Sequence, residues 1–325
     1  MRPENTNNLP HPLQRLNQPT ASQRHSLANR SRSAIALLLV FTTLIFLTPA
    51  AAEEFNRLQE QCWSSYRHKR TNVPPVIEPN AVSFANIDDE YRVYSPFKVA
   101  FAVRGKGVAF AGKDVPGTGH HHILINKKLP INIQQSLPFD DQHRHFGKGQ
   151  TSTTLDLPVG QHKLRLLFAD YNHVPFLMVS KEITVNVVAP RGALLNQPLR
   201  IDAKDFAATC ARWHENERTK PDPVGALAFL ENIRDGDVLR TPFNVQLGAE
   251  GVAICAKQGG TAGSGYFDVS VIRDRQSVLR KPLENGETQF SIDLPAGAYM
   301  IEVALRDPSG KQMTATPQRY RVRVE

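Results

Sequence analysis

The chain contains two copies of one pattern of short strands, and this internal repeat limits the fold more than any other feature. Five matches between the copies define it: Phe84 with Phe229, 95–97 with 241–243, 107–109 with 251–253, 155–160 with 292–297, and Asp170 with Asp307. The offset is 144–146 residues in the early matches and 137 in the late ones, so the second copy lacks residues over 130–150. Two copies indicate a duplicated domain, because a solenoid is built from more repeats.

Each copy consists of β-rich runs separated by Gly, Pro and Asp. In the first copy the runs cover 82–85, 97–103, 123–125, 153–157, 164–168 and 183–187. Several short strands with turn residues between them are typical of an antiparallel sandwich. We therefore expect an all-β chain with two tandem immunoglobulin-like antiparallel β-sandwich domains, at residues 81–190 and 226–325.

A short helical segment is predicted before each sandwich, followed by a linker, at 53–80 and at 191–225. In the first segment several side chains fall near one face of a helix: Phe55, Leu58, Cys62 and Tyr66. Cys62 has a counterpart in Cys210. These two cysteines either form a disulfide across a loop of 149 residues or remain separate thiols, and the third cysteine is Cys255.

The first 52 residues have the pattern of a signal peptide. A polar region with five arginines and a single acid, Glu4, precedes an apolar run of 14 residues, 34–47, and the small residues 50–52 suit cleavage after Ala52. An uncleaved N-terminal anchor is the alternative. We expect a periplasmic or secreted protein, in which disulfides are chemically possible.

Charge and hydropathy exclude two classes of partner. Removal of 1–52 takes away five Arg and one Glu, so the net charge falls from +8 to +4. The remaining chain has no long Lys/Arg tract interleaved with aromatic residues, so we expect no nucleic-acid partner. It has no second apolar segment of 18 residues, so we expect a mature protein that does not span the membrane.

Seven of the eleven histidines lie between 120 and 173: His120, His121, His122, His143, His145, His162 and His173. Neutral imidazole is the commonest protein metal ligand. The second copy lacks all of them: when Gly119 is matched with Gly263, the three consecutive histidines face Ser264, Gly265 and Tyr266, while His162 and His173 face Tyr299 and Gly310. The fold therefore does not require these histidines, which indicates a site in the first domain.

Strand alternation groups the histidines. His120 and His122 fall on one face with Leu124, and His121 takes the other face as a surface or packing residue. His162 lies at the mouth of an inward-facing apolar row, either as a structural residue or as a support for the site. His143 and His145 offer a second His-x-His pair on a loop. A His-x-His pair closed by another His is a recurring three-histidine metal site.

Three carboxylates lie near the histidines in the sequence. Asp140, Asp141 and Asp170 could complete the ligand shell or orient the imidazoles. The segment 147–149 is Gly-rich and basic but lacks the strand–loop–helix context of a phosphate loop, so it predicts a turn and no nucleotide cofactor. No Gly-x-Ser-x-Gly elbow accompanies any serine.

Three blocks of the first copy resemble a bacterial secreted family known as domain of unknown function 4399, over residues 105–187. The blocks are 117–122, 143–151, and 157–164 continuing to 170–175. This chain has Phe176 where family members often have a further histidine. The resemblance implies a shared site but assigns no activity to it.

The residues lead to a first hypothesis and two alternatives. The first is a periplasmic or secreted binding module that holds a divalent transition metal, namely zinc, copper or nickel, through ligands drawn from His120, His122, His143, His145 and His173, with His162 in support. The alternative is a structural or protein-binding tandem sandwich of the cell envelope without metal. A metal-dependent hydrolase or oxidase would need an open coordination position and a base, for which the three aspartates are the nearest candidates.

Overall fold

The computed structural model describes residues 49–71, 79–129, 132, 135–190, 199–221, 227–313 and 316–325. Residues 1–48 of the predicted signal peptide, 1–52, and parts of both predicted linkers therefore lie outside the described residues, while 49–52 begin the first helix. Residues Leu47–Glu325 form one compact unit. Within the described part of the chain, no helix combines the length and the apolar character needed to cross a membrane.

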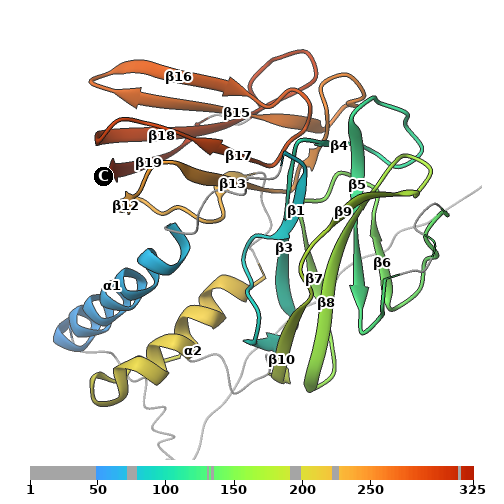
Figure 1. The fold of residues 1–325 in the computed structure, drawn as a ribbon. Coiled ribbons are helices and arrows are strands. Elements are labelled where there is room, and N and C mark those ends of the chain that lie inside the picture. The colour runs from blue at the N-terminus through green and yellow to red at the C-terminus, as the bar shows by residue number, and fades with distance from the viewer. Residues whose placement is uncertain are drawn as a thin grey trace, which may run out of the picture. The chain divides into compact units, whose positions relative to one another are not determined.

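The first sandwich consists of two sheets (Figure 1). One sheet has the order β1-β3-β7, with β1 at Ala81–Phe84, β3 at Phe97–Arg104 and β7 at Ser152–Leu155. The other has the order β2-β10-β8-β5-β4, with β2 at Tyr91–Ser95, β10 at Ile183–Pro190, β8 at Gly160–Ala169, β5 at Thr118–Ile125 and β4 at Gly107–Val108. Two further strands join this second sheet: β6 (His143–Phe146) pairs with β5, and β9 (Pro175–Val179) pairs with β8.

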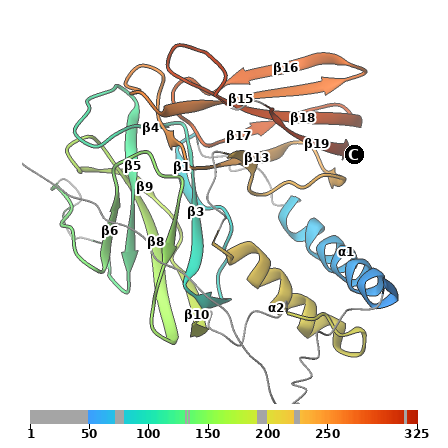
Figure 2. The ribbon, with the colours of Figure 1, turned by 180° about the vertical axis from the view of Figure 1, so that it is seen from behind.

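The second sandwich repeats this arrangement (Figure 2). One sheet has the order β11-β13-β17, with β11 at Leu227–Leu230, β13 at Phe243–Glu250 and β17 at Gln289–Ile292. The other has the order β12-β19-β18-β15-β14, with β12 at Asp237–Leu239, β19 at Gln318–Val324, β18 at Gly297–Arg306, β15 at Ser264–Arg273 and β14 at Ala253–Ile254, while β16 (Gln276–Pro282) pairs with β15. The predicted tandem β-sandwich fold is confirmed.

Not every pairing is antiparallel. β2 runs parallel to β10, and β12 runs parallel to β19. In the sequence β2 follows β1, and β12 follows β11. Each of these two short strands joins the sheet opposite to that of the strand before it. The short strands β4 and β14 also run parallel to their neighbours β5 and β15. The remaining pairings are antiparallel, as predicted, and the parallel strands are the short ones at the sheet edges.

The core follows the period of two that a pleated strand imposes. On β3 the side chains of Phe97, Val99, Phe101 and Val103 are buried, and on β8 those of Leu164, Leu166 and Phe168. The β3 residues face those of β8 across the first sandwich, together with Ile123 and Ile125 of β5, which lies beside β8 in the same sheet. The same alternation fills the second sandwich, so the hydrophobic pattern of each run predicts its inward face.

Hydrogen bonds and strand registers fix the true correspondence between the copies. Gly107 lies opposite Thr118 in the first sandwich, and Ala253 lies opposite Ser264 in the second. The offset is therefore 146 as far as Ile125, so the sequence match at 144 was wrong by two residues and that of Phe84 with Phe229 by one. A slip of two residues keeps every side chain on its own face, so the hydrophobic pattern cannot detect it. From His143 onward the offset is 137, which places nine extra residues in the β5–β6 loop, 126–142.

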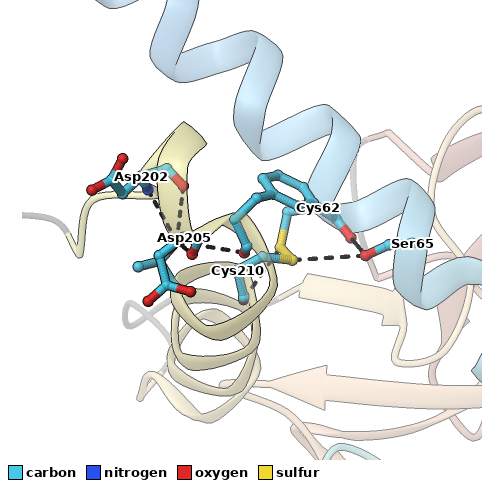
Figure 3. The surroundings of a disulfide bond; sticks show 7 residues. Cys62, Ser65, Asp202, Asp205 and Cys210 are labelled. Carbon is cyan, nitrogen blue, oxygen red and sulfur yellow. Dashed lines mark hydrogen bonds between the residues drawn. A yellow bond between two sulfur atoms is a disulfide. The ribbon is translucent and has the colours of Figure 1, made fainter.

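A disulfide joins the two helices that precede the sandwiches (Figure 3). Cys62 lies on α1 (Pro49–Thr71) and Cys210 on α2 (Phe206–Thr219), which follows a short 3-10 turn, η2 (Ala203–Asp205). Around it the helices bury a small apolar cluster of Leu58, Ile201 and Trp213. The helical segment predicted in the first part of 53–80 is confirmed, with observed ends at 49 and 71. Of the two possibilities for the cysteines, the structure shows the disulfide.

We expect the Cys62→Ala/Cys210→Ala double variant to be less stable than the parent chain by up to about 5 kcal/mol, because the bridge closes a loop of 149 residues in the unfolded chain. Urea unfolding with and without a reductant measures this. The reductant should lower the midpoint of the parent chain and leave that of the variant unchanged. Equal midpoints for parent and variant would show that the bridge contributes nothing to stability.

Candidate metal centre

The three consecutive histidines lie in the middle of a sheet, on β5. Figures 1 and 2 show β5 between β6 and β8, and all three imidazoles are fully buried. His120 and His122 point to one face of this sheet together with Leu124. That face is the outer one, turned away from the sheet that contains β3, because Ile123 and Ile125 on the opposite face belong to the main core.

His121 packs in the main core. Its ring lies 5.1 Å from that of Phe101 and 5.0 Å from that of Phe168, measured between centroids. Burial lowers the pKa of His121 to about 3. Of the two roles considered for His121, the structure assigns packing.

Four imidazoles converge on the outer face: those of His120, His122, His145 and His173. The Nε2 atoms of His120 and His122 are 3.1 Å apart, and one ring nitrogen from each of His120, His122 and His145 lies within 4.8 Å of the other two. His145 reaches the cluster because it lies directly opposite His122 in the β5–β6 register. The pair predicted on a loop, His143 and His145, is therefore on a strand.

His173 approaches the cluster from the turn after β8. Its ring centroid is 4.9 Å from those of both His120 and His145. The carboxylate of Asp170 holds this turn by accepting hydrogen bonds from the backbone N–H groups of Asn172 (2.9 Å) and Val174 (2.8 Å). Asp170 thus orients the segment that carries an imidazole, and its side chain is engaged by the backbone.

The nine-residue excess of the β5–β6 loop covers the cluster. Phe139 lies 4.7 Å from the ring of His145 and 4.8 Å from that of His173, and the amide of Leu137 donates to the carbonyl of His173 (3.0 Å). Leu137 also packs with Leu124, Leu167 and Ala169 in a separate small apolar cluster. Sequence reasoning missed Phe139 and Leu137, although the shift in the repeat offset pointed to this loop.

Gly147 makes room for one of the four rings. A Cβ at this position would lie 2.4 Å from Nε2 of His145 and 2.6 Å from Cβ of Ala111. A side chain at 147 would therefore displace the imidazole or the backbone. This explains why a glycine follows the His-x-His pair of β6.

Electrostatics keep the cluster neutral. Burial, followed by the nearby imidazoles His145 and His173, lowers the pKa of His120 to about 3, and burial followed by His120 lowers that of His122 to about 2. Burial is also the main cause of the lowered pKa of His145. Neutral imidazoles have free lone pairs at neutral pH, which is the state that a metal ion requires.

Several buried ring nitrogens have no hydrogen-bond partner in the described structure: Nδ1 of His120, Nδ1 of His122, Nε2 of His143 and Nε2 of His145. Buried polar atoms are nearly always hydrogen-bonded, so a group of exceptions in one place requires an explanation. His120 and His122 share a hydrogen bond between their Nε2 atoms, so their unpaired nitrogens are Nδ1, while Nε2 of His145 is free to bind an ion. The residues therefore fit a cation with a preference for imidazole.

Two predicted residues lie apart from the four rings. His162 is near the other end of β8, where Nε2 donates to the carbonyl of Pro158 (2.8 Å). In the second sandwich Tyr299 makes the same bond to Pro295 (2.8 Å), which assigns His162 a structural role. His143 is buried but lies farther out, with its ring 6.1 Å from that of His122. Burial, followed by the charge of Lys127, lowers its pKa.

The two remaining aspartates do not join the cluster. Asp140 forms an ion pair with Lys127 at 2.6 Å, and the side chain of Asp141 is 99% exposed beside Arg144. The prediction that these carboxylates complete a ligand shell therefore finds no support in their positions. The converging donors are imidazoles.

The second sandwich shows what the same location holds without histidines. By the true correspondence, Tyr266, Asp268, Pro282 and Gly310 occupy the positions of His120, His122, His145 and His173. Asp268 is buried and pairs with Arg280 (2.8 Å) and with Arg306. In the second sandwich an ion-paired carboxylate and two arginines therefore occupy this location, whereas in the first sandwich neutral imidazoles line it.

Residues 99–188 match the family model described as Domain of unknown function (DUF4399). This match covers most of the first sandwich. The resemblance predicted from the three sequence blocks is thereby confirmed, and all four converging histidines lie within the DUF4399 match. Phe176, at the position of the family's further histidine, stacks on Phe168 at 6.2 Å, and Phe168 belongs to the main core, on the face opposite the cluster.

No curated protein sequence matches this chain. Several solved structures are similar to it. They include the fibronectin(III)-like modules of Clostridium thermocellum CbhA (10% identity, TM-score 0.22, 75% of this chain and 94% of that chain), CopC from Methylosinus trichosporium OB3b (13%, 0.22, 31% and 94%) and the FN1–FN3 domains of chicken CNTN1 (10%, 0.21, 78% and 68%).

Proposed function

We propose that the protein is an exported binding module that holds one divalent transition metal ion in its DUF4399 domain. The convergence of ring nitrogens from His120, His122 and His145 within 4.8 Å carries this proposal. Three imidazoles at such a spacing need only small side-chain adjustments to reach metal–nitrogen distances of about 2.0–2.1 Å. The lowered pKa values of all three keep them unprotonated at neutral pH.

The disulfide supports export. Disulfides such as Cys62–Cys210 persist in oxidising compartments and are rare in the cytosol. This agrees with the signal peptide predicted from the sequence. We therefore propose a location in the periplasm or outside the cell.

Binding is a better proposal than catalysis. A hydrolase or oxidase would need a base beside the metal. Of the three candidate carboxylates, that of Asp140 pairs with Lys127, that of Asp141 is exposed beside Arg144, and that of Asp170 accepts hydrogen bonds from the backbone of its own turn. The apolar side chains of Phe139 and Leu137 cover the cluster instead. We propose no reaction at this site.

Titration tests the proposed function. The full chain is stripped with a chelator and titrated with Zn²⁺ in competition with a chromophoric chelator. We expect one equivalent to bind the parent chain and the His162→Gln variant, and none to bind with comparable affinity after His145→Gln. A parent chain that binds no Zn²⁺, Cu²⁺ or Ni²⁺ would leave an envelope scaffold without metal as the better description.

Phe139 should control how fast the metal leaves. The ring is 56% exposed, yet it contacts three of the four imidazoles. Loss of aromatic contacts worth about 0.5–1.5 kcal/mol would accelerate release by up to roughly tenfold. We expect Phe139→Ala to release metal to excess chelator faster in stopped-flow experiments. Val278→Ala, at an exposed apolar position of β16, is the matched control and should release metal at the parent rate.

A further inference from the structure

The arrangement of the four rings indicates a coordination geometry. Five of the six centroid separations fall between 4.8 and 5.1 Å, and the sixth, between His122 and His173, is 6.0 Å. With metal–nitrogen distances of about 2.0–2.1 Å, a tetrahedral site places imidazole centroids about 5.2 Å apart, whereas a square-planar site gives about 4.5 Å for neighbours and about 6.4 Å for opposite rings. The observed centroids are closer to a tetrahedron opened along one edge, and His173, on that edge, is not one of the three residues whose ring nitrogens lie within 4.8 Å of one another.

His173 has an unusual backbone for a residue with a side chain. Its φ is +66°, in the left-handed region where glycine is preferred, and the corresponding residue of the second sandwich is Gly310, with φ +90°. The two turns are otherwise built alike, since Asp307 accepts from the amides of Ser309 (2.9 Å) and Lys311 (3.0 Å) just as Asp170 does in its own turn. The first sandwich thus has a histidine at a position where the backbone of the turn favours glycine.

The edge opened between His122 and His173 is covered. Phe139 lies nearly parallel to His122, with an interplanar angle of 14° and a centroid separation of 6.2 Å, and contacts His173 at 4.8 Å. Beyond it Leu137 is buried against Leu124. An aromatic ring therefore lies at the side of the cluster where an exchangeable water would have to enter.

We infer that His173 is a fourth protein ligand and that the four imidazoles hold Zn²⁺ in a closed, near-tetrahedral site with no open coordination position. This rests on the proposed function and adds to it the preferred ion and the state of the site. Four-coordinate tetrahedral sites made only of protein ligands are typical of Zn²⁺ that is held without reacting, whereas catalytic zinc keeps one position for water or substrate. Ni²⁺ and Cu²⁺ favour tetragonal surroundings, so this geometry selects against them relative to their intrinsic affinities.

Co²⁺ bound to the stripped full chain reports the geometry. We expect the intense visible bands of tetrahedral Co²⁺ and no spectral change on addition of azide, because no position is free for it. In the His173→Gly variant, which installs the residue found in the second sandwich, we expect azide to shift the bands and Zn²⁺ affinity to fall by roughly 10²–10³-fold. In Zn²⁺/Ni²⁺ competition the parent chain should prefer Zn²⁺ by roughly tenfold or more.

The outcomes separate this inference from the proposed function. Failure of Co²⁺ and Zn²⁺ to bind the parent chain would remove both. Binding with a weak, azide-sensitive spectrum in the parent chain, or equal Zn²⁺ affinity of the parent chain and His173→Gly, would overturn the closed four-histidine site and leave the three-histidine proposal standing. His173→Asn is a second variant that also tolerates positive φ, and unfolding of both variants by circular dichroism would contradict the assignment of His173 as a ligand that the fold does not need.

Discussion

Replacement of both His120 and His122 by Gln is expected to abolish metal binding while the chain remains folded. The two Nε2 atoms, 3.1 Å apart, supply two of the converging donors. Zinc sites built from four protein ligands contribute about 10–16 kcal/mol, so each ligand accounts for about 2.5–4 kcal/mol, and loss of two should weaken binding by at least roughly 10⁴-fold. Chelator competition on the purified variant measures this.

The control for this double variant is His162→Gln, since it makes the same chemical change at a histidine that bonds to Pro158 and lies outside the cluster. We expect its metal affinity to equal that of the parent chain. The fold of the double variant should survive because the second sandwich builds the same strands with Tyr266 and Asp268 at these positions. Unchanged affinity in the double variant would place the metal elsewhere or nowhere.

Acid is expected to destabilise the metal-free protein by several kcal/mol. The pKa values of His120 and His121 are lowered to about 3 and that of His122 to about 2, against 6.5 in the unfolded chain. Above pH 6.5 both states are neutral, so no penalty exists there. As the pH falls below 6.5 the unfolded chain gains protons that the folded chain excludes, and stability decreases until the pH approaches 3.

Each of these histidines contributes up to about 1.4 kcal/mol per pH unit in that window, or up to about 2 kcal/mol between pH 7.5 and 5. Urea unfolding of the stripped protein at a series of pH values measures the sum. The His120→Gln/His122→Gln variant should show a shallower dependence, because two of the three excluded protons are gone. If the slopes of the parent chain and the variant are identical, the buried imidazoles do not remain neutral as the structure indicates.

The sequence was sufficient to predict the fold because each strand has an apolar period of two and each turn has its Gly, Pro or Asp. It could not set the register between the copies. The match of Gly119 with Gly263 keeps every side chain on its own face, and only the pairing of Gly107 with Thr118 and of Ala253 with Ser264 shows that Gly119 corresponds to Gly265.

The grouping of the histidines was predicted in part. Alternation on β5 correctly placed His120 and His122 together, but it could not show which face of the sheet they occupy. The apolar residue in phase with them, Leu124, belongs to the small cluster under the β5–β6 loop, because that loop covers the outer face of the sheet. For the same reason His162, on the inward row of β8, is on the opposite face from the pair that it was expected to support.

The periodicity of apolar residues along the sequence could not predict the contacts made by loops. Phe139 and His173 lie on two loops that are separate in the sequence and that contact the strand histidines only in the folded chain. The hydrogen bond from the amide of Leu137 to the carbonyl of His173 joins these two loops. The change of repeat offset between Ile125 and His143 showed where the extra residues lie in the sequence. It did not show that they fold over the histidines. Loops lack the regular spacing that makes strand and helix faces predictable.

Elemental analysis of the untagged full chain, purified without added metal or chelator, tests the central claim most directly. The parent chain should contain about one equivalent of zinc, and the His120→Gln/His122→Gln variant purified beside it should contain none. Absence of zinc, copper and nickel from the parent chain, even after incubation with excess ions and removal of the unbound metal, would contradict a metal centre in the DUF4399 domain.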